Sequence, residues 1–253
     1  NTSQAQTFTI NVTPVNDVPM FTAENPPAVN EDAPQQTIAG WASNFIPGPA
    51  DEGPGAGNEN QTILSYTVSE VEDPSLFTAA GQPAVDINGN LTYTPAADQW
   101  GSSTFKVTVK DSGGTDNDGV DEYSKVLTIT INSVNDQPNF AAAAIPVNTE
   151  DDTPISIPGW ITNFDPGAPN ESSQGVLDYI VNVTDPDGLF AQDPDVSNLG
   201  TLTYSLNPEV SGEATFTLAV QDTGGTERDG VDTSEVQEFT ITVQSENDAP
   251  VNL

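Results

Sequence analysis

The side chains of this chain that could do chemistry are carboxylates and amides, and they gather in three short segments that each end in proline. The segments are Val15-Asn16-Asp17-Val18-Pro19, Val134-Asn135-Asp136-Gln137-Pro138 and Glu246-Asn247-Asp248-Ala249-Pro250. Asn and Asp offer oxygen ligands without positive charge, which suits a hard cation. Proline fixes φ and favours an extended residue before it, so each segment indicates a stiff joint between folded units. We therefore predict that the joints bind metal.

Further acidic positions recur between the joints, in loops and at strand ends. Glu31 and Asp32 correspond to Glu150 and Asp151 in a second copy of the pattern. Asp111 and Asp222 each end a predicted strand before a Gly-Gly pair, where a carboxylate can point along the sheet axis toward the next unit. Clustered acids in glycine-containing loops are typical of calcium sites. The mid-repeat candidates are Asp51, Glu52 and Asp73 in the first copy and Asp165, Glu171, Asp185 and Asp187 in the second.

The chain contains no His and no Cys. This removes disulfides, thiolate and imidazole ligands and the commonest general base, and it leaves hard-oxygen chemistry of the calcium or magnesium kind. A His-assisted Ser or Cys nucleophile is impossible, and no glycine-rich loop leads from a strand into a helix. No carboxylate pair stands out from the many surface acids as a glycosidase pair. We predict that the chain is not an enzyme.

The formal net charge is −34, from 38 Asp and Glu residues against four Lys and Arg. Such a surface repels nucleic acid and anionic membrane, so we expect neither as a partner. A hydrophobic content of 35% favours a folded chain, and divalent cations would relieve its self-repulsion. No apolar run is long enough to span a membrane, so we expect no membrane insertion. The start at Asn1 rather than Met indicates a fragment of a longer protein.

Alternating apolar residues identify the elements that must position these ligands. The alternation runs through residues 8–12, 105–109, 127–131, 216–220 and 239–243, with Thr at most intervening positions. A period of two is typical of half-exposed strands, and no helical period is present. Short strands broken by Gly, Pro, Asn and Asp clusters favour an all-β chain of antiparallel Greek-key β-sandwiches. We assign Trp41 and Trp160, each of which follows a Gly, to the sandwich cores.

Comparison of the chain with itself divides it into repeats, because residues 104–115 align with residues 215–226. We predict repeat 1 at 16–134, repeat 2 at 135–246 and the start of another joint at 247–253. Residues 1–15 match the last strand of a repeat and are assigned to a preceding one. A lone strand with an apolar face is unstable in water. An alternative is therefore that this strand completes the sheet of another chain and builds a head-to-tail filament.

The joints, the Glu-Asp pairs, the Thr92-Tyr93-Thr94-Pro95 run and the Asp-x-Gly-Gly strand ends together resemble tandem cadherin-like repeats of large bacterial surface proteins and adhesins. The resemblance covers essentially the whole chain. It implies cadherin-like or immunoglobulin-like β-sandwiches held in line by calcium, neighbouring repeats of the same protein as partners, and an extracellular, cell-surface location. The ligands it implies at the middle joint are Glu31, Asp73, Asn135, Asp136, Glu171 and Asp222. The half-sites it implies are Asn16, Asp17, Glu52 and Asp111 at the start and Glu150, Asp185, Asn247 and Asp248 at the end.

Two features depart from a simple calcium pattern. Ser133 and Gln137 stand where eukaryotic cadherins carry an Asp before and an Asn after the Asn-Asp pair, which indicates fewer ions per joint. The acidic turn at 116–121 has a counterpart that contains Arg228, and a cation inside a cation site is unfavourable. We assign this turn to hairpin chemistry, with Gly at positive φ.

The resulting functional hypothesis is a calcium-binding structural or adhesive repeat module of an extracellular bacterial surface protein. Two alternatives remain open. One is a carbohydrate-binding module that uses an exposed Trp100 or exposed Tyr residues to bind cell-surface glycans. The other is the subunit of an extracellular filament, in which copies of the chain form homotypic head-to-tail contacts by strand complementation.

Overall fold

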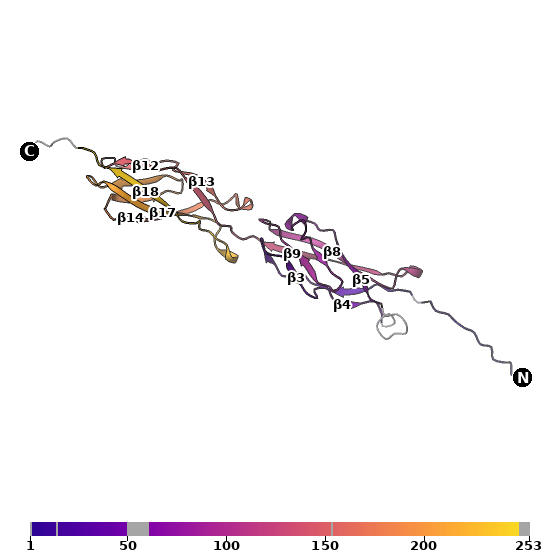
Figure 1. The fold of residues 1–253 in the computed structure, drawn as a ribbon. Helices are drawn as coiled ribbons and strands as arrows, with labels where there is room; N and C mark the ends of the chain where they lie inside the picture. The colour runs from indigo at the N-terminus through magenta and orange to yellow at the C-terminus, as the bar shows by residue number, and fades with distance from the viewer. Residues whose placement is uncertain (1, 14, 50–60, 153, 248–253) are drawn as a thin grey trace, which may run out of the picture. The chain divides into compact units, whose positions relative to one another are not determined.

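The structure is a computed structural model that describes residues 2–13, 15–49, 61–152 and 154–247. The chain divides into two compact units, unit 1 at Asn1–Ser133 and unit 2 at Val134–Leu253 (Figure 1). Within the described residues, the regular structure consists of β-strands and four short 3-10 helices. The prediction of an all-β chain built from β-sandwiches is confirmed.

Unit 1 contains a four-stranded sheet in the order β2-β9-β8-β5, a three-stranded sheet in the order β3-β7-β6 and the pair β1-β4. All pairings are antiparallel except β2 with β9. The strands are β1 (Met20–Thr22), β2 (Val29–Asn30), β3 (Gln36–Ile38), β4 (Ser43–Ile46), β5 (Ile63–Ser69), β6 (Ala84–Val85), β7 (Leu91–Tyr93), β8 (Gly101–Asp111) and β9 (Glu122–Asn132).

Unit 2 repeats this arrangement, with sheets in the orders β11-β18-β17-β14, β12-β16-β15 and β10-β13. Its parallel pair is β11 with β18. The strands are β10 (Asn139–Ala142), β11 (Asn148–Thr149), β12 (Ile155–Ile157), β13 (Ile161–Asp165), β14 (Val176–Thr184), β15 (Phe190–Val196), β16 (Leu202–Leu206), β17 (Gly212–Asp222) and β18 (Gln237–Gln244).

The parallel pair in each unit is a short exception to the antiparallel arrangement predicted from the sequence. Val29 and Asn30 lie beside Ile131 and Asn132, and Asn148 and Thr149 lie beside the end of β18. The second strand of each unit, β2 or β11, thus runs alongside the last strand of its own unit, in the same direction. This pairing positions the Glu that follows it at that end of the sheet.

The core of each unit lies between its two larger sheets. In β8, Phe105, Val107 and Val109 are almost fully buried, and the residues between them are partly exposed. They pack against Leu91 and Tyr93 of β7 in the opposite sheet. Because side chains alternate across a strand, the period of two in the sequence places these residues inward. The same arrangement recurs in unit 2 around β17.

Both predicted core tryptophans are confirmed, with a difference between the units. Trp160 is fully buried, and its ring lies 5.8 Å from that of Phe216. Trp41 is partly buried and stacks on Phe105 at 5.9 Å, and its Nε1 donates to the Glu24 carbonyl. The fully buried ring in unit 2 therefore contributes more apolar burial than its counterpart.

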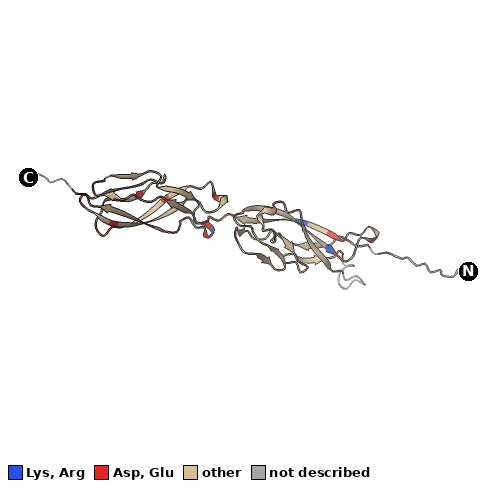
Figure 2. Cartoon of the chain, turned by 45° about the horizontal axis from the view of Figure 1, so that its top comes forward, with Lys and Arg blue, Asp and Glu red and all other residues tan. Residues whose placement is uncertain are grey.

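Residues 2–13 form no strand, and Phe8, Ile10 and Val12 are 85–87% exposed. Their assignment to a preceding repeat, or to the sheet of another chain, stays a prediction. The few cations are unevenly distributed, with Lys106, Lys110 and Lys125 on strands of unit 1 and Arg228 in unit 2 (Figure 2).

Candidate functional site

The Asn of the middle joint is seated on unit 2, at the end where β17 finishes; we call this the entry end of a unit. Asn135 Nδ2 donates to Asp222 Oδ1 at 3.1 Å and to the Val231 carbonyl at 2.8 Å. Its own carbonyl accepts a hydrogen bond from the Val231 amide at 2.9 Å. Asn135 and Asp222 are 8% and 1% exposed. These are therefore buried hydrogen bonds, which water does not weaken.

The first joint makes the same contacts at the entry end of unit 1. Asn16 Nδ2 donates to Asp111 Oδ1 at 3.1 Å, to the Gly114 carbonyl at 3.1 Å and to the Val120 carbonyl at 2.8 Å. The Asn16 carbonyl accepts from the Val120 amide at 2.9 Å. The structure thus brings Asn16 and Asn135 each together with the Asp at the end of the long strand of its unit.

The glycines after these Asp residues make room for the joint. A Cβ at Gly113 would lie 2.0 Å from Asn16 Oδ1, and one at Gly224 would lie 1.7 Å from Asn135 Oδ1. Heavy atoms without a covalent bond do not approach so closely. The Asp-x-Gly-Gly pattern therefore recurs because only glycine admits the Asn side chain at this point.

Glu171 reaches the entry end of unit 2 from the 3-10 helix η3 (Pro169–Glu171) and is 4% exposed. Its Oε1 accepts a hydrogen bond from the Asp136 amide at 3.0 Å, and its Oε2 accepts one from the Ala168 amide at 3.4 Å. Of the residues predicted for the middle joint, Asn135, Asp136, Glu171 and Asp222 are thus gathered within unit 2.

Burial raises the pKa of the carboxyls of Asp111, Glu171 and Asp222 above their ordinary range, although hydrogen bonds from neighbouring amides partly oppose this rise. None of the ion pairs found among the described residues includes these three side chains. A buried carboxylate without a cationic partner is costly, and either a proton or a bound cation relieves that cost.

Glu31 and Glu150 lie at the opposite end of their units, beside the last strand; we call this the exit end. The Glu31 amide donates to the Asn132 carbonyl at 2.9 Å, and the Glu150 amide donates to the Gln244 carbonyl at 3.2 Å. Glu150 Oε1 accepts a hydrogen bond from the Glu246 amide at 2.9 Å. Both Glu side chains are buried. The structure therefore places a buried carboxylate at the exit end of each unit as well.

Asp73 and Asp185 stabilise local turns. Asp73 Oδ1 accepts from the Ser75 amide at 3.1 Å and the Ser75 hydroxyl at 2.5 Å. The two carboxylate oxygens of Asp185 accept from the Leu189 amide at 2.9 Å and the Phe190 amide at 3.0 Å. Each carboxylate retains further lone pairs, so a role as metal ligand stays a prediction for both.

The remaining predicted ligands are less informative. Asp17 and Asn247 are exposed. Glu52 and Asp248 lie outside the described residues. The assignment of these four residues to metal sites stays a prediction.

Sequence reasoning missed two glutamines. Gln174 Nε2 donates to Asn135 Oδ1 at 2.8 Å, and Gln61 Nε2 lies against Gly113 beside Asn16 Oδ1. Each Gln stands two residues before the first long strand of its unit, β5 or β14. The sequence did contain a clue to them: a Gln stands at the same position in both repeats, although it carries no charge.

The oxygen atoms at the entry ends fit calcium. Asn16 Oδ1, Gln61 Oε1 and Asp111 Oδ2 are buried and accept no hydrogen bond from the described residues, and Gln174 Oε1 in unit 2 is in the same state. Carboxylate and amide oxygens are the ligands that calcium prefers. A calcium ion would also neutralise the buried carboxylate.

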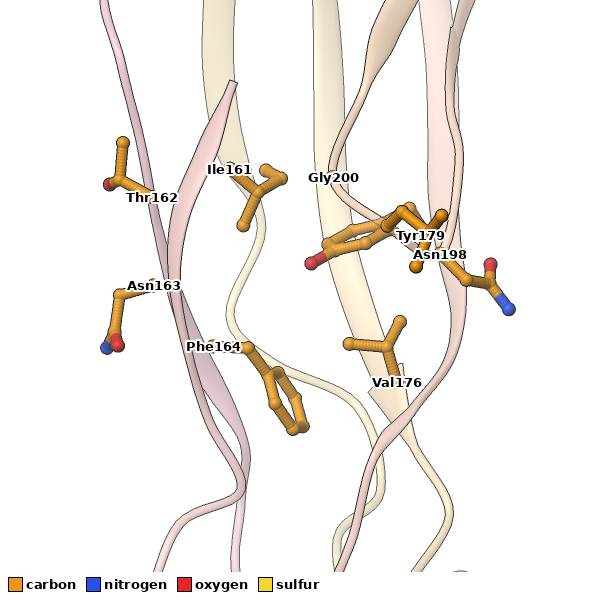
Figure 3. A pocket seen from close by; sticks show the side chains of 9 residues that line it. Ile161, Thr162, Asn163, Phe164, Val176, Tyr179, Asn198 and Gly200 are labelled. Carbon is orange, nitrogen blue, oxygen red and sulfur yellow. The ribbon is translucent and has the colours of Figure 1, made fainter. Parts of the chain in front are cut away.

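Unit 2 also has two surface hollows that differ from the entry-end site. One, of about 200 Å³, lies beside the ring of Tyr179, and Ile161, Phe164 and Val176 point toward it (Figure 3). The other, of about 570 Å³, lies along the edge strand β14 and is lined by acidic side chains that include Asp178. The first is lined by both apolar and polar residues, the latter including Asn163 and Asn198, and the second is the open edge of the sheet.

The two units are β-sandwiches of the same topology, and each has buried acids at both ends. The chain is therefore of the tandem-repeat class. Residues 1–121 match the family model described as bacterial Ig domain. Human protocadherin Fat 4 is 28% identical over 179 residues, which are 70% of this chain and 3% of that protein. The chain thus spans a very small part of this relative.

Two solved structures are similar to this chain, and the first of them shows the same fold. Mouse cadherin-23 EC22-24 matches with a TM-score of 0.50 and 18% identity, covering 90% of this chain and 67% of that one. Human protocadherin-24 EC1-2 gives a TM-score of 0.49 and 18% identity, covering 89% of this chain and 98% of that one. The chain thus has the fold of cadherin-like, immunoglobulin-like repeats. Within the described ranges, no helix has the length and apolar character that a membrane crossing requires.

Proposed function

We propose that this chain is a structural or adhesive module of an extracellular bacterial surface protein, and that calcium binds at the ends of its units and stiffens the tandem array. Cadherin-like and immunoglobulin-like repeats are typically extracellular and non-enzymatic, which is compatible with this role. The match of residues 1–121 to the bacterial Ig domain supports a bacterial origin.

The observation that supports calcium is the burial of Asp111, Glu171 and Asp222 without an ion pair among the described residues. In unit 1, buried oxygens of Asn16 and Asp111 are also left without a hydrogen-bond donor. When bound, calcium supplies positive charge for these oxygens. The chain's own residues hold the oxygens in place. In unit 2 the side chain of Asn135 lies against Gly224, Asp222 and Val231, and we call this surface the seat of the joint Asn.

The proposed mechanism is linkage. A cation that binds the folded, docked arrangement and not the unfolded chain lowers the free energy of the former by RT ln(1 + [L]/Kd). Glu31 at the exit end of unit 1 and the Asn135 group at the entry end of unit 2 supply ligands to the middle joint. Without calcium, the clustered carboxylates repel each other and the joint loosens.

The test compares the chain in calcium and in chelator by isothermal titration calorimetry, thermal melting and small-angle scattering. We expect calcium binding, a higher melting temperature and a narrower range of chain dimensions in calcium. The variant Glu171→Gln with Asp222→Asn should lose binding at the middle joint. Its matched control, Asp116→Asn with Glu227→Gln, changes the net charge equally at exposed positions and should bind as the wild type does. Identical dimensions and melting in chelator would refute the proposal.

Carbohydrate binding is a second candidate, because the Trp100 side chain is 55% exposed. An exposed aromatic ring can stack on a sugar. Glycan-array binding that disappears in Trp100→Ala, with an unchanged melting temperature, would support this function. Binding to no glycan would remove it.

A filament formed by strand complementation is a third candidate, supported by the exposed apolar side chains of Phe8, Ile10 and Val12. Light scattering of the chain with and without residues 1–15 tests it. A monomer mass for both forms would remove this candidate.

A further inference from the structure

We infer that Asn135 and Gln174 are positioning residues, which seat the joint on the entry end of unit 2 without any cation. Calcium then acts on a site of which one half is already built. The evidence for the seat comes from the geometry of unit 2 alone. The statement that calcium binds to this half-built site rests on the proposed function.

The hydrogen bonds of the joint come from side chains and from the backbone. The side chain of Asn135 bonds to Asp222 and its carbonyl bonds to the Val231 amide. The Asp136 amide bonds to Glu171 at 3.0 Å, and Gln137 Nε2 bonds to the Thr233 carbonyl at 3.1 Å. Residues 135–137 thus each contact unit 2 through at least one hydrogen bond, although they have no strand structure of their own.

Gln174, Asp222 and the Val231 carbonyl together fix which way the Asn135 amide faces. Gln174 Nε2 donates to Asn135 Oδ1 at 2.8 Å, so the Asn135 NH₂ group must face the Asp222 carboxylate. A carboxylate buried at this point therefore receives a hydrogen-bond donor even when no cation is present. An amide is suited to this role because it carries a donor and an acceptor on the same planar group.

The Asn contacts of the seat recur in unit 1, where Asn16 takes the place of Asn135. Gln61 stands where Gln174 does, but its Nε2 and Asn16 Oδ1 make no hydrogen bond among the described residues. The distances from the Asn Nδ2 to the carboxylate and to the backbone carbonyl are 3.1 and 2.8 Å in both units. A Cβ at Gly119 or Gly230, in the Asp-Gly-Val-Asp turns, would lie 3.0 Å from the Cβ of the seated Asn. These turns therefore form one wall of the seat. The predicted positive φ at their Gly is wrong, because φ is −62° at Gly119 and −60° at Gly230 and is positive at the preceding Asp118 and Asp229 instead.

The seat locates the part of the joint that stays with unit 2 when calcium leaves. Asn132 is tied to unit 1, because its carbonyl accepts from the Glu31 amide, and Asn135 is tied to unit 2. Only Ser133 and Val134 lie between them. We therefore expect residues 135–137 to stay with unit 2 in chelator.

The test is amide hydrogen exchange of the full chain in chelator, followed by NMR at the amides of Asp136 and Val231. In the wild type we expect both amides to exchange at least about tenfold more slowly than exposed loop amides, because each is a donor in the seat. In Asn135→Asp, a second carboxylate faces Asp222, and we expect both amides to exchange about tenfold faster than in the wild type. The amide of Leu218, in the central strand β17, reports global unfolding and should not change.

A steric pair keeps the test independent of charge. Gly224→Ala places a Cβ where Asn135 Oδ1 lies, and Gly175→Ala places one in open space. We expect faster exchange at Asp136 and Val231 in Gly224→Ala only. Wild-type amides that exchange like exposed loops, or equal protection in both alanine variants, would overturn the inference. The exchange experiment is done in chelator. A failure of the chain to bind calcium would therefore refute the proposed function and leave the result on the seat unchanged.

Discussion

The two units present the same seat to the joint but balance its charge differently. In unit 1, Lys110 lies beside Asp111 and pairs with Asp121 at 3.0 Å and Glu122 at 3.2 Å. In unit 2, the corresponding Gln221 donates from its neutral amide to Asp232 at 2.8 Å. Unit 1 therefore has its own cation next to the buried carboxylate, and unit 2 has none at that position.

This difference shows that the geometry of the seat does not depend on whether a cation lies next to it. The Asn-to-Asp distances agree between the units although the neighbouring cation does not. Unit 2 also carries the buried Glu171 at the same end. We therefore expect the stability of unit 2 to depend on calcium more strongly than that of unit 1.

The largest effects are expected from substitutions in the two cores. They also show which melting transition belongs to which unit. Trp160→Ala should destabilise unit 2 by about 3–5 kcal/mol, because a fully buried ring is lost and a cavity remains. Trp41→Ala should destabilise unit 1 by about 2 kcal/mol, because its ring is only partly buried. Differential scanning calorimetry in calcium measures both.

If the units melt independently, each variant should lower one transition and leave the other in place. This control identifies the transition that responds to calcium. Equal losses in both variants would contradict the difference in burial between the two rings.

A smaller effect is expected from pH in chelator. The folded-state pKa values of Asp111, Glu171 and Asp222 are raised by burial, so the folded chain holds these protons more tightly than the unfolded chain does. Their charged forms destabilise the fold at neutral pH. Stability should rise as the pH falls through the raised values, and the gain should be complete below the ordinary carboxyl range.

Among the described residues, burial raises the pKa of one carboxyl in unit 1 (Asp111) and of two in unit 2 (Glu171 and Asp222), so we expect unit 2 to gain more from this change. In calcium the direction should reverse, since protons displace the cation from its ligands. Thermal melts at pH 7 and pH 5, in chelator and in calcium, measure both directions. A lower melting temperature of unit 2 at pH 5 in chelator would contradict the prediction.

Much of the fold follows from local pattern. The period of two in residues 105–109 and 216–220 predicts the central strands, because one face of each strand must be buried. The Gly that precedes each Trp and the self-alignment of the chain predict two equivalent units. The parallel pairing of β2 with β9 could not be predicted, because two residues beside the end of a distant strand leave no period in the sequence.

The candidate site was predictable in its acids and less so in its seat. Asn16, Asp111, Asn135 and Asp222 stood out because they recur at joints and strand ends. Gln61 and Gln174 did not, because an uncharged amide becomes informative only when its partner is known. Whether an Asn amide presents its nitrogen or its oxygen to a carboxylate depends on all the donors and acceptors around it, such as the Val231 carbonyl at Asn135, and sequence spacing does not contain that information.

The smallest expected effect is the most direct test of the charge comparison. Lys110→Gln gives unit 1 the neutral amide of unit 2, and Gln221→Lys gives unit 2 the cation of unit 1. Because Lys110 is partly exposed and its ion pairs are screened by salt, we expect shifts of about 2 °C in the chelator melting temperature, down for Lys110→Gln and up for Gln221→Lys.

The sign of the two shifts matters more than their size. If a neighbouring cation substitutes in part for calcium, Lys110→Gln should widen the difference between calcium and chelator for unit 1, and Gln221→Lys should narrow it for unit 2. High salt should reduce both changes, because screening removes the contribution of an exposed cation. Shifts of the same sign in the two variants would show that the residues at 110 and 221 act through packing, and the charge comparison between the units would then fail.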